Sequence, residues 1–547
     1  MPYGAGTQFA HRNRSVSADR FAMVPRADIP RSVFVTDFTH KTTFDADFLI
    51  PVYVDEVLPG DSFSVRATMF ARLSTPLFPI MDNLHLDSFF FFCPCRLVWD
   101  NWEQFMGERK PNPESSIDYV IPKLAPFSGA ASGTVFDYFG LPHSTFVTTP
   151  MTNISALPFR VYNLIYNEWF RDENLIASFQ VPTGLGPDAL SNFNLAPRGK
   201  RHDYFTSALP WPQKGDAVSL PLGTLAPVKG IGFLDNATVT TGPDAFRETG
   251  GDSVSYPFYV AGAGVATGDV AFMADDISPA TPGIYADLSE ASAATINMLR
   301  LAFQTQRLLE RDARGGTRYT EILRSHFGVL PQDARLQRPE YLGGGRSSVV
   351  INPVVQNSAT GIEGGDSPLG ALGAVGTALS QHGFSQSFTE HGYIIGLVSV
   401  RADLTYQQGL HRMWTRNTRY DFFWPVFSHL GEQAILSREI YATGEPEDGD
   451  VFGYQERWAE YRYRPSLITG MFRSGISGTL DAWHLSQFFG TRPTLGGAFV
   501  LNNTPMARIL AAGDLASGQE FLFDSVWSRR VTRAMPAYSV PGFVDRF

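Results

Sequence analysis

The amino-acid sequence predicts a mainly β protein with elaborate loops, on three observations. The 547 residues include 50 glycines and 37 prolines, spread along the chain rather than gathered in one linker. Aromatic residues make up 13% of the chain, and 43 of its residues are phenylalanine. Several segments alternate apolar and polar residues with the period of two that indicates a strand with one face in a core. Such a chain turns often and packs rings between its turns, unlike a helical or doubly wound enzyme.

The clearest strand patterns lie near the N-terminus. Residues 62–69 alternate strictly between apolar and polar side chains. Residues 84–92 form an apolar face that contains Phe90 and a partly aromatic face that contains Asp87 and Phe91, and we expect this second face to meet another surface. Strand patterns return late in the chain, so the sheet is assembled from both of its ends, at 393–406, 468–472 and 520–527.

Helices are expected at three places. Residues 99–108 form a short amphipathic segment, and residues 155–170 form a second helix with Pro158 in its first turn. The longest helix is expected to begin near a cap at Ser289 and to end at the glycine pair 315–316. The charges near its end predict either salt bridges between subunits or a solvated helix end.

Two turn-rich regions separate these elements. Residues 220–290 are rich in small residues and turns, which predicts a surface excursion with short strands of its own. Residues 343–383 are glycine-rich and are interpreted as a loose region. The glycine-rich stretches within residues 343–383 lack the lysine and the spacing of a phosphate-binding loop. The polar residues 1–40 predict an N-terminal arm, with folding beginning near Lys41.

Composition limits the classes of function. The longest apolar runs fall well short of the ~20 residues that span a bilayer, and the N-terminus lacks the apolar core of a signal peptide. Cys93 and Cys95 are the only cysteines, with too few further ligands nearby to predict a metal site. The sequence contains no G-x-S-x-G or H-E-x-x-H motif, and Asp55 and Glu56 fit a solvated turn better than a catalytic pair. We therefore expect no catalytic residues, no metal and no cofactor.

Five segments resemble a known family, in family order and across most of the chain: 50–108, 200–215, 308–329, 333–344 and 451–466. They closely resemble the major capsid proteins of the microviruses, which are small tailless single-stranded DNA phages, and in particular those of the gokushoviruses. The resemblance implies an eight-stranded viral jelly roll with long insertions that fills residues 41–547. It also implies self-assembly into a T=1 icosahedral shell around a circular single-stranded DNA genome, without enzymatic activity.

The resemblance implies partners and a location as well. These are further copies of the chain, the single-stranded DNA genome, a small basic DNA-binding peptide, pilot and scaffolding proteins, and a host receptor that could be a glycan. The chain would be made and assembled in the bacterial cytoplasm and would end in the virion capsid, without membrane insertion. The alternative function is a β-sandwich protein that binds or hydrolyses glycans, which exposed tryptophan and tyrosine and loop carboxylates would suit.

Charge and aromatic content predict three candidate surfaces. The formal net charge is −10, yet the first 31 residues carry five arginines and two aspartates. The locally basic positions Arg12, Arg14, Arg529, Arg530 and Arg533 are therefore expected either to face DNA or to form a solvated surface. A subunit interface or a core strand is predicted at Tyr454, Arg457, Trp458 and Tyr461. Residues 220–290 are expected to form an outward protrusion that binds the host or clamps a trimer.

Overall fold

The computed structural model describes residues 31–109, 116–216, 218, 228–229, 285–286, 296–315, 319–328, 336–357 and 370–538. The chain divides into two compact units. The first combines Met1–Pro210 with Gln332–Phe547, and the second is Trp211–Pro331. The first unit thus combines residues from both ends of the chain.

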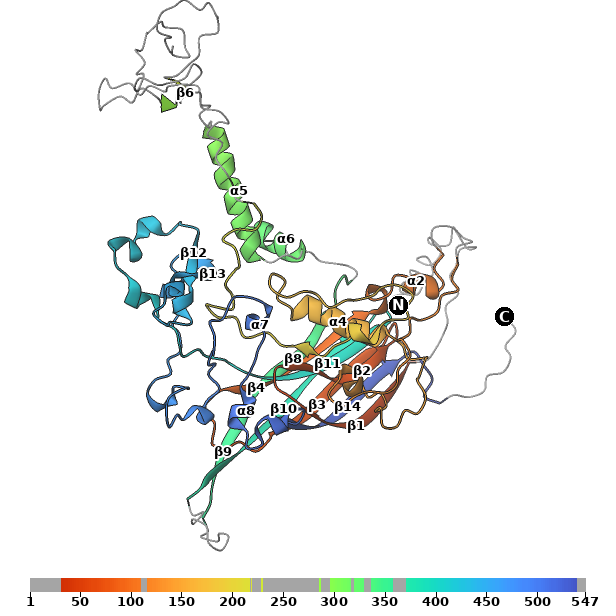
Figure 1. Cartoon of the computed structure of the whole chain (residues 1–547). Helices are drawn as coiled ribbons and strands as arrows, with labels where there is room; N and C mark the ends of the chain where they lie inside the picture. Colours follow the sequence, from red (N-terminus) through yellow and green to blue (C-terminus); the bar gives the residue numbers. More distant parts are fainter. Residues whose placement is uncertain are drawn as a thin grey trace, which may run out of the picture. The chain divides into compact units, whose positions relative to one another are not determined.

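The first unit is built on two five-stranded antiparallel sheets (Figure 1). The first sheet has the order β1 (Ser32–Phe44), β14 (Phe521–Arg533), β3 (Ser62–Leu73), β10 (Leu372–Ser387), β9 (Val350–Val355). The second sheet has the order β5 (Ala196–Pro197), β2 (Phe48–Val57), β11 (Gly392–Ala402), β4 (Leu84–Pro94), β8 (Glu340–Ser348). The predicted mainly β fold is confirmed, as a β-sandwich.

The inner faces of the two sheets share one apolar core. Alternate residues of β3 are buried, and β4 contributes Phe90 from the facing sheet. Trp527 of β14 lies at the centre, with its ring 5.0 Å from that of Tyr53 and 6.0 Å from that of Phe90. Stacked and edge-to-face rings of this kind contribute about 0.5–1.5 kcal/mol per pair beyond their buried area.

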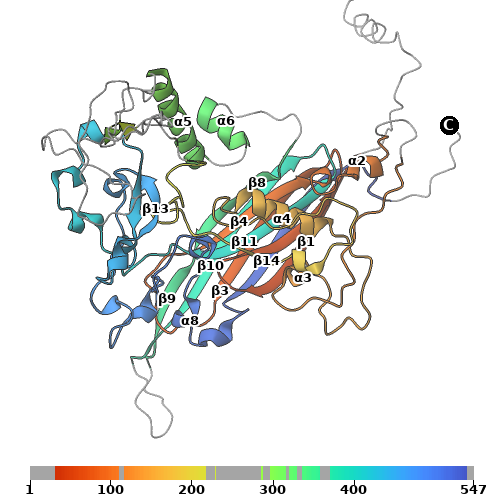
Figure 2. The same ribbon diagram turned by 45° about the horizontal axis from the view of Figure 1, so that its top comes forward.

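The outer face of the second sheet is covered by helices and loops of the same unit. The helices are α2 (Trp102–Phe105), α3 (Val135–Tyr138) and α4 (Leu157–Trp169), and Figure 2 shows α4 lying across the sheet. Phe91 packs on this side, with ring centroids 5.8 Å from Phe170 and 5.5 Å from Trp169. The partly aromatic face of β4 therefore meets its own subunit.

Beside the sandwich, a third apolar cluster joins Phe205, Tyr406, Phe452 and Phe499. It supports the antiparallel pair β12 (Glu432–Leu436) and β13 (Val451–Glu456) and the short α-helix α7 (Gly497–Val500). The short α-helix α8 (Met506–Ile509) instead packs Met506 and Ile509 against the core of the sandwich. Short 3-10 helices lie between the strands and helices of the first unit: Cys95–Leu97, Leu190–Asn192, Arg412–Thr415, Arg419–Asp421, Pro425–Phe427, Ser437–Glu439, Pro446–Gly449, Ala459–Tyr461, Gly470–Phe472, Asp481–Trp483 and Gly513–Ala516.

Three expectations from the sequence are wrong. Strand pairing begins at Ser32 rather than near Lys41, because β1 is an edge strand with most of its side chains in solvent and so lacks a clear alternation. The expected strand at 468–472 is a turn that contains the 3-10 helix Gly470–Phe472. The glycine-rich region that begins at 343 contains parts of β8, β9 and β10 rather than a loose loop.

Close backbone approach explains the glycines of β8. Gly344 has φ +152°, and a Cβ there would lie 2.1 Å from the carbonyl oxygen of Ser88 in β4. A Cβ at Gly345 would lie 2.3 Å from the ring of His382. Glycine at these positions allows β8 to approach β4 and His382 closely, and it does not indicate a flexible loop.

In the second unit the structure describes two helices and one short strand pair. The helices are α5 (Ile296–Gly315) and α6 (Tyr319–Phe327), and the His326 ring lies 2.7 Å from the Asp312 carboxylate. Strands β6 (Val228–Lys229) and β7 (Tyr285–Ala286) pair antiparallel. The end of the long predicted helix is confirmed, whereas its predicted cap at Ser289 lies outside the described residues. This second unit, Trp211–Pro331, includes more residues than the protrusion expected at 220–290.

Candidate functional site

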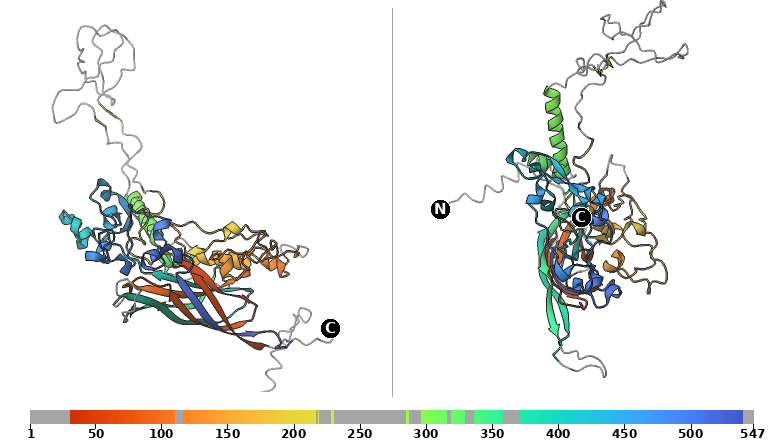
Figure 3. Two further views of the ribbon diagram at one scale, coloured as in Figure 1. Left: turned by 60° about the horizontal axis from the view of Figure 1, so that its bottom comes forward. Right: turned by 60° about the vertical axis from the view of Figure 1, so that its left-hand side comes forward.

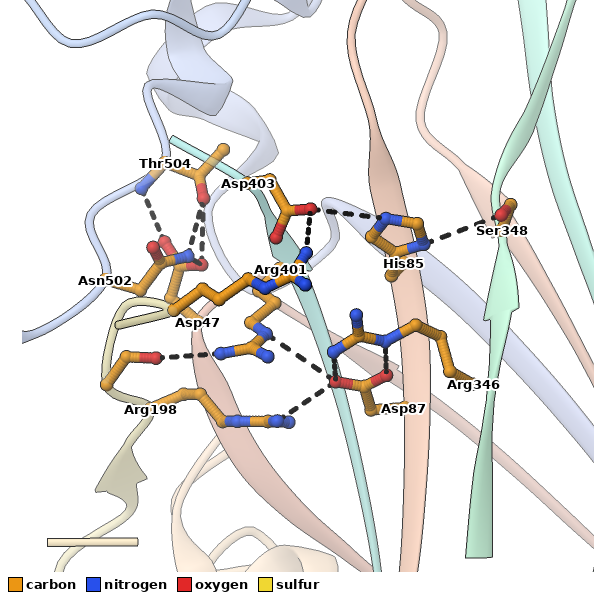
Figure 4. Close-up of polar contacts among 12 residues, drawn as sticks. Asp47, His85, Asp87, Arg198, Arg346, Ser348, Arg401, Asp403, Asn502 and Thr504 are labelled. Carbon is orange, nitrogen blue, oxygen red and sulfur yellow. Dashed lines mark hydrogen bonds and ion pairs between the residues drawn. The ribbon is translucent and has the colours of Figure 1, made fainter. Parts of the chain in front are cut away.

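A buried ionic network lies on the covered side of the second sheet (Figure 4). Asp87 of β4 is 2% exposed and accepts a hydrogen bond of 3.0 Å from Arg198 and bonds of 2.7 and 3.3 Å from Arg346 of β8. Arg401 of β11 lies 3.6 Å from the same carboxylate. Burial, with Arg401 nearby, lowers the pKa of Arg198 to about 10. One carboxylate of β4 thus joins three neighbouring strands, β4, β8 and β11, to the covering segment that contains Arg198.

A second buried carboxylate extends this network. Asp47 accepts hydrogen bonds from the Thr504 backbone N–H at 2.5 Å and the Thr504 hydroxyl at 2.8 Å, and a further one from the Asn502 amide. Burial raises the pKa of Asp47. These contacts join the start of β2 to the C-terminal segment, which indicates a structural role.

A small pocket of about 200 Å³ lies beside this network, lined among others by Lys200, Asp203 and Tyr406. The Lys200 ammonium donates to Gln487 at 2.8 Å and lies 4.1 Å from the centroid of the Phe499 ring. Burial lowers the pKa of Lys200 to about 8. The Asp203 carboxylate accepts bonds from the backbone of the following turn. These groups are engaged in holding the fold and do not form a nucleophile-and-base arrangement.

A group of exposed aromatic side chains lies on the loops of the first unit, and we call it the aromatic surface. It combines residues 414–426 with Tyr461. Trp414 is 70% exposed and Trp424 is 50% exposed, although large aromatic side chains usually bury most of their area. The remaining members are also exposed: Tyr420, Phe422, Phe423, Val426 and Tyr461.

The aromatic surface is held in place by polar contacts beneath it. The Trp424 indole N–H donates to the Arg419 carbonyl at 2.9 Å, and the Trp458 indole N–H donates to the Phe427 carbonyl at 3.0 Å. The Arg416 guanidinium lies 4.2 Å from the Tyr461 ring centroid and 3.3 Å from the Glu460 carboxylate. The loop therefore presents its rings from a defined scaffold, which lowers the entropy cost of binding.

The four predicted interface residues have different surroundings in the structure, and only one of them belongs to the aromatic surface. Tyr461 belongs to the aromatic surface, whereas Trp458 is only 6% exposed and lies under it, with its ring 5.7 Å from that of Phe423. Arg457 lies 4.7 Å from the Trp458 ring, and Tyr454 pairs through its backbone with Leu209. The geometry favours a packing role for Trp458. Residues 412–427 were not among the predicted interface residues. Their sequence, RMWTRNTRYDFFWPVF, nevertheless contains six aromatic residues and three arginines, and both residue types are enriched in interfaces.

The predicted DNA-facing arginines of β14 separate in the same way. Arg529 donates to Asp55, and Arg533 donates to Asp61 at 2.8 Å, so both are paired on the inner side. Arg530 points to the opposite face and is exposed. Arg12 and Arg14 lie outside the described residues.

Metal and membrane features are limited in the described ranges. Cys93 and Cys95 are free and buried, and burial raises the pKa of both thiols. No group of three or more His, Cys, Asp or Glu in the part of the chain that the structure describes could hold a metal ion. None of the described helices is long and apolar enough to cross a membrane.

Comparison with known proteins identifies the family. Residues 22–543 match the phage family described as Capsid protein (F protein). The chain is 48% identical to the capsid protein VP1 of Bdellovibrio phage phiMH2K over 541 residues, which cover 96% of this chain and 98% of that protein. It is 43% identical to the capsid protein VP1 of Chlamydia phage 1, over 96% of this chain and 98% of the relative.

The chain belongs to the phage capsid protein (F protein) family. It is also 34% identical to the capsid protein VP1 of Spiroplasma virus 4, over 95% of this chain and 97% of that relative. The predicted resemblance to microvirus capsid proteins is confirmed. This capsid protein is a structural component of a bacteriophage virion and not an enzyme, and a capsid protein forms a shell with copies of itself.

Proposed function

We propose that this capsid protein is the major subunit of a small T=1 icosahedral shell that encloses a circular single-stranded DNA genome. Its sandwich serves as the viral jelly roll. The strand order supports this topology, because without the short edge strands β5 and β9 the sheets have the orders β1-β14-β3-β10 and β2-β11-β4-β8. The chain crosses from one sheet to the other after β1, β2 and β3, as the two Greek keys of a jelly roll require.

The aromatic surface carries the assembly part of this proposal. At roughly half exposure, six aromatic side chains of ~200 Å² each present about 600 Å² of mostly apolar area. That is as large as the largest patch on a typical monomer, and more than half of the ~800 Å² per partner in a standard interface. Rings mixed with arginine are the usual anchors of such contacts. A neighbouring copy of the chain is the occupant that closes a shell.

Replacement of two rings tests the assembly role. Phe422→Ser with Trp424→Ser is expected to leave a folded subunit that no longer forms closed particles in electron micrographs. Leu515→Ser is the matched control, because Leu515 is 85% exposed outside the aromatic surface. Normal particles from the double variant would contradict the role of the aromatic surface, whereas failure of the control as well would indicate a general loss of solubility.

We further propose that residues 220–290 form the protrusion that binds a host receptor. The pairing of Val228 with Ala286 brings the two ends of this segment together, which suits an insertion that can be shortened. Replacement of residues 236–276 by a short Gly-Ser bridge is expected to preserve particles and to reduce adsorption to host cells. Loss of particles would instead support a clamp between subunits, and unchanged adsorption would contradict the receptor role.

The net charge of the chain supports a further proposed partner, a small basic DNA-binding peptide. A shell subunit with a net charge of −10 cannot neutralise a genome by itself, so a small basic DNA-binding peptide supplies counter-charge. Pilot and scaffolding proteins complete the proposed partners during assembly.

A further inference from the structure

Within the first unit, the described residues leave the outer face of the first sheet uncovered. The registers of paired strands show which side chains point outward from this sheet, since β14 pairs with β1 on one side and with β3 on the other. Val35 lies opposite Arg530, which lies opposite Ser64, and each of these three side chains is exposed. In Figure 3 (left) the covering helices and loops of the first unit lie on the other side of the strands. In the described part of the first unit, the sandwich thus has one covered face, on the second sheet, and one uncovered face, on the first sheet, which we call the bare face.

The bare face is positively charged on an acidic chain. Four cationic side chains point outward from its strands, against two carboxylates: Lys41, Arg66, Arg72 and Arg530, against Asp37 and Asp524. Lys41 and Asp524 pair with each other at 2.7 Å. The three arginines form no ion pair with any residue that the structure describes, in contrast to Arg529 and Arg533 on the inner side.

The distances between Arg66, Arg72 and Arg530 suit contacts to several phosphates of one extended chain. Ser64 is opposite Arg530 and Ser528 is opposite Arg66, so Arg66 and Arg530 are diagonal neighbours about 7–8 Å apart. Arg72 lies six residues farther along β3, about 20 Å away. Unpaired like charges held side by side on a rigid sheet are unfavourable without a counter-charge. Their arrangement therefore favours an extended anionic ligand over a compact one.

An exposed ring lies between these charges. Phe70 is 43% exposed, two residues from Arg72 on the same face, and lies opposite Leu379 of β10. Leu379 and Val526 are also exposed. A ring and aliphatic side chains flanked by arginines match the base and phosphate of an unpaired nucleotide, because any base can stack on a ring.

We propose that the bare face of the first sheet binds single-stranded DNA, with Arg66, Arg72 and Arg530 contacting phosphates and Phe70 stacking on a base. This inference rests on the proposed function and assigns the genome-facing surface to a sheet face rather than to the arginine cluster of β14.

The salt dependence of binding tests the phosphate contacts. Each phosphate contact to single-stranded DNA contributes about 0.7 to the slope of log affinity against log salt concentration. Purified full-length subunit would be titrated with fluorescent oligo(dT) at 25–200 mM KCl. The variant Arg66→Gln/Arg72→Gln/Arg530→Gln is expected to reduce the slope by about 2, and Arg530→Gln alone by about 0.7. The corresponding lysine variant is expected to keep the slope, because it keeps the charges.

The matched control is Arg300→Gln/Arg464→Gln/Arg473→Gln, which removes the same charge from exposed positions outside the bare face. It is expected to leave the slope unchanged. Phe70→Leu is expected to weaken binding roughly tenfold at every salt concentration without changing the slope.

Three results would overturn the inference. They are no binding by the unaltered subunit at 25 mM KCl, equal slopes for the glutamine variant and its control, or normal binding by a glutamine variant that fails to form particles. The last result would assign the face to a second copy of the chain. Electron microscopy of each variant reports particle formation separately, so failure of the shell proposal is distinguishable from failure of the DNA-binding one.

Discussion

Asp87→Asn is expected to be the most destabilising isosteric change in the second sheet. The substitution keeps the size of the side chain but removes the carboxylate that contacts Arg198, Arg346 and Arg401. The side chains of Arg198 and Arg401 are 8% and 11% exposed, so water cannot replace the lost charge. Removal of one partner from a buried ion pair costs about 3–5 kcal/mol. The asparagine oxygen still accepts a hydrogen bond, so we expect the lower end of this range.

Urea unfolding of the unassembled subunit, followed by tryptophan fluorescence, measures this cost. The matched control is Asp524→Asn, which makes the same substitution in the first sheet. Asp524 pairs with Lys41 at 2.7 Å, but their side chains are 45% and 72% exposed. Exposed pairs contribute about 0–1 kcal/mol, so the control should shift the midpoint little, and less still at high salt.

The comparison decides whether burial sets the value of an ion pair in this fold. If Asp87→Asn and Asp524→Asn lowered the free energy of unfolding by amounts within about 1 kcal/mol of each other, the argument from burial would be refuted. Arg346→Met supplies an intermediate case, because the Arg346 side chain is 38% exposed and its loss leaves Asp87 with two cations.

Two further predictions follow from buried groups. Burial beside Asp45 and Asp47 raises the pKa of Glu520 from 4.5 to about 7, so the folded chain binds this proton more tightly than the unfolded chain. The stability it contributes is present below pH 4.5 and is lost as the pH rises through 7. Glu520→Gln should therefore gain about 2 kcal/mol relative to the natural chain between pH 5 and pH 8 in urea unfolding, and a constant difference would exclude this titration. Trp458→Ala should cost about 3–5 kcal/mol and reduce the yield of soluble subunit, whereas normal thermal stability with normal particles would contradict its packing role.

Elements with a clear alternation could be predicted from the sequence. Strands β3 and β4 have one face in the shared core, so the burial pattern is visible in the residue order. Helix α4 was equally visible, because its buried residues recur at helical spacing. Strand β1 was missed because both sides of an edge strand contact water, and β8 because close approach to β4 selects glycine over strand formers.

The candidate surfaces could be predicted only in part. Tyr461 was identified, but the rest of the aromatic surface lies on another loop, and exposure is a property of the folded chain. The arginines of β14 illustrate the same limit. Their clustering is visible in the sequence, whereas their pairing with Asp55 and Asp61 involves residues more than 470 positions away. Only the fold separates Arg530 from its neighbours.

The aromatic surface and the bare face are made of different residues, and their proposed occupants differ in chemistry, so their defects should separate. Loss of Phe422 and Trp424 removes apolar area and leaves every cation of the bare face in place. Such a subunit should remain unassembled and still bind oligo(dT) with an unchanged salt slope. Loss of Arg66, Arg72 and Arg530 removes charge without altering the aromatic surface, so closed particles should form but retain DNA poorly as the salt concentration rises. A single surface that served both roles would produce both defects in both variants. The two measurements together therefore test whether this capsid protein separates shell contacts from genome contacts.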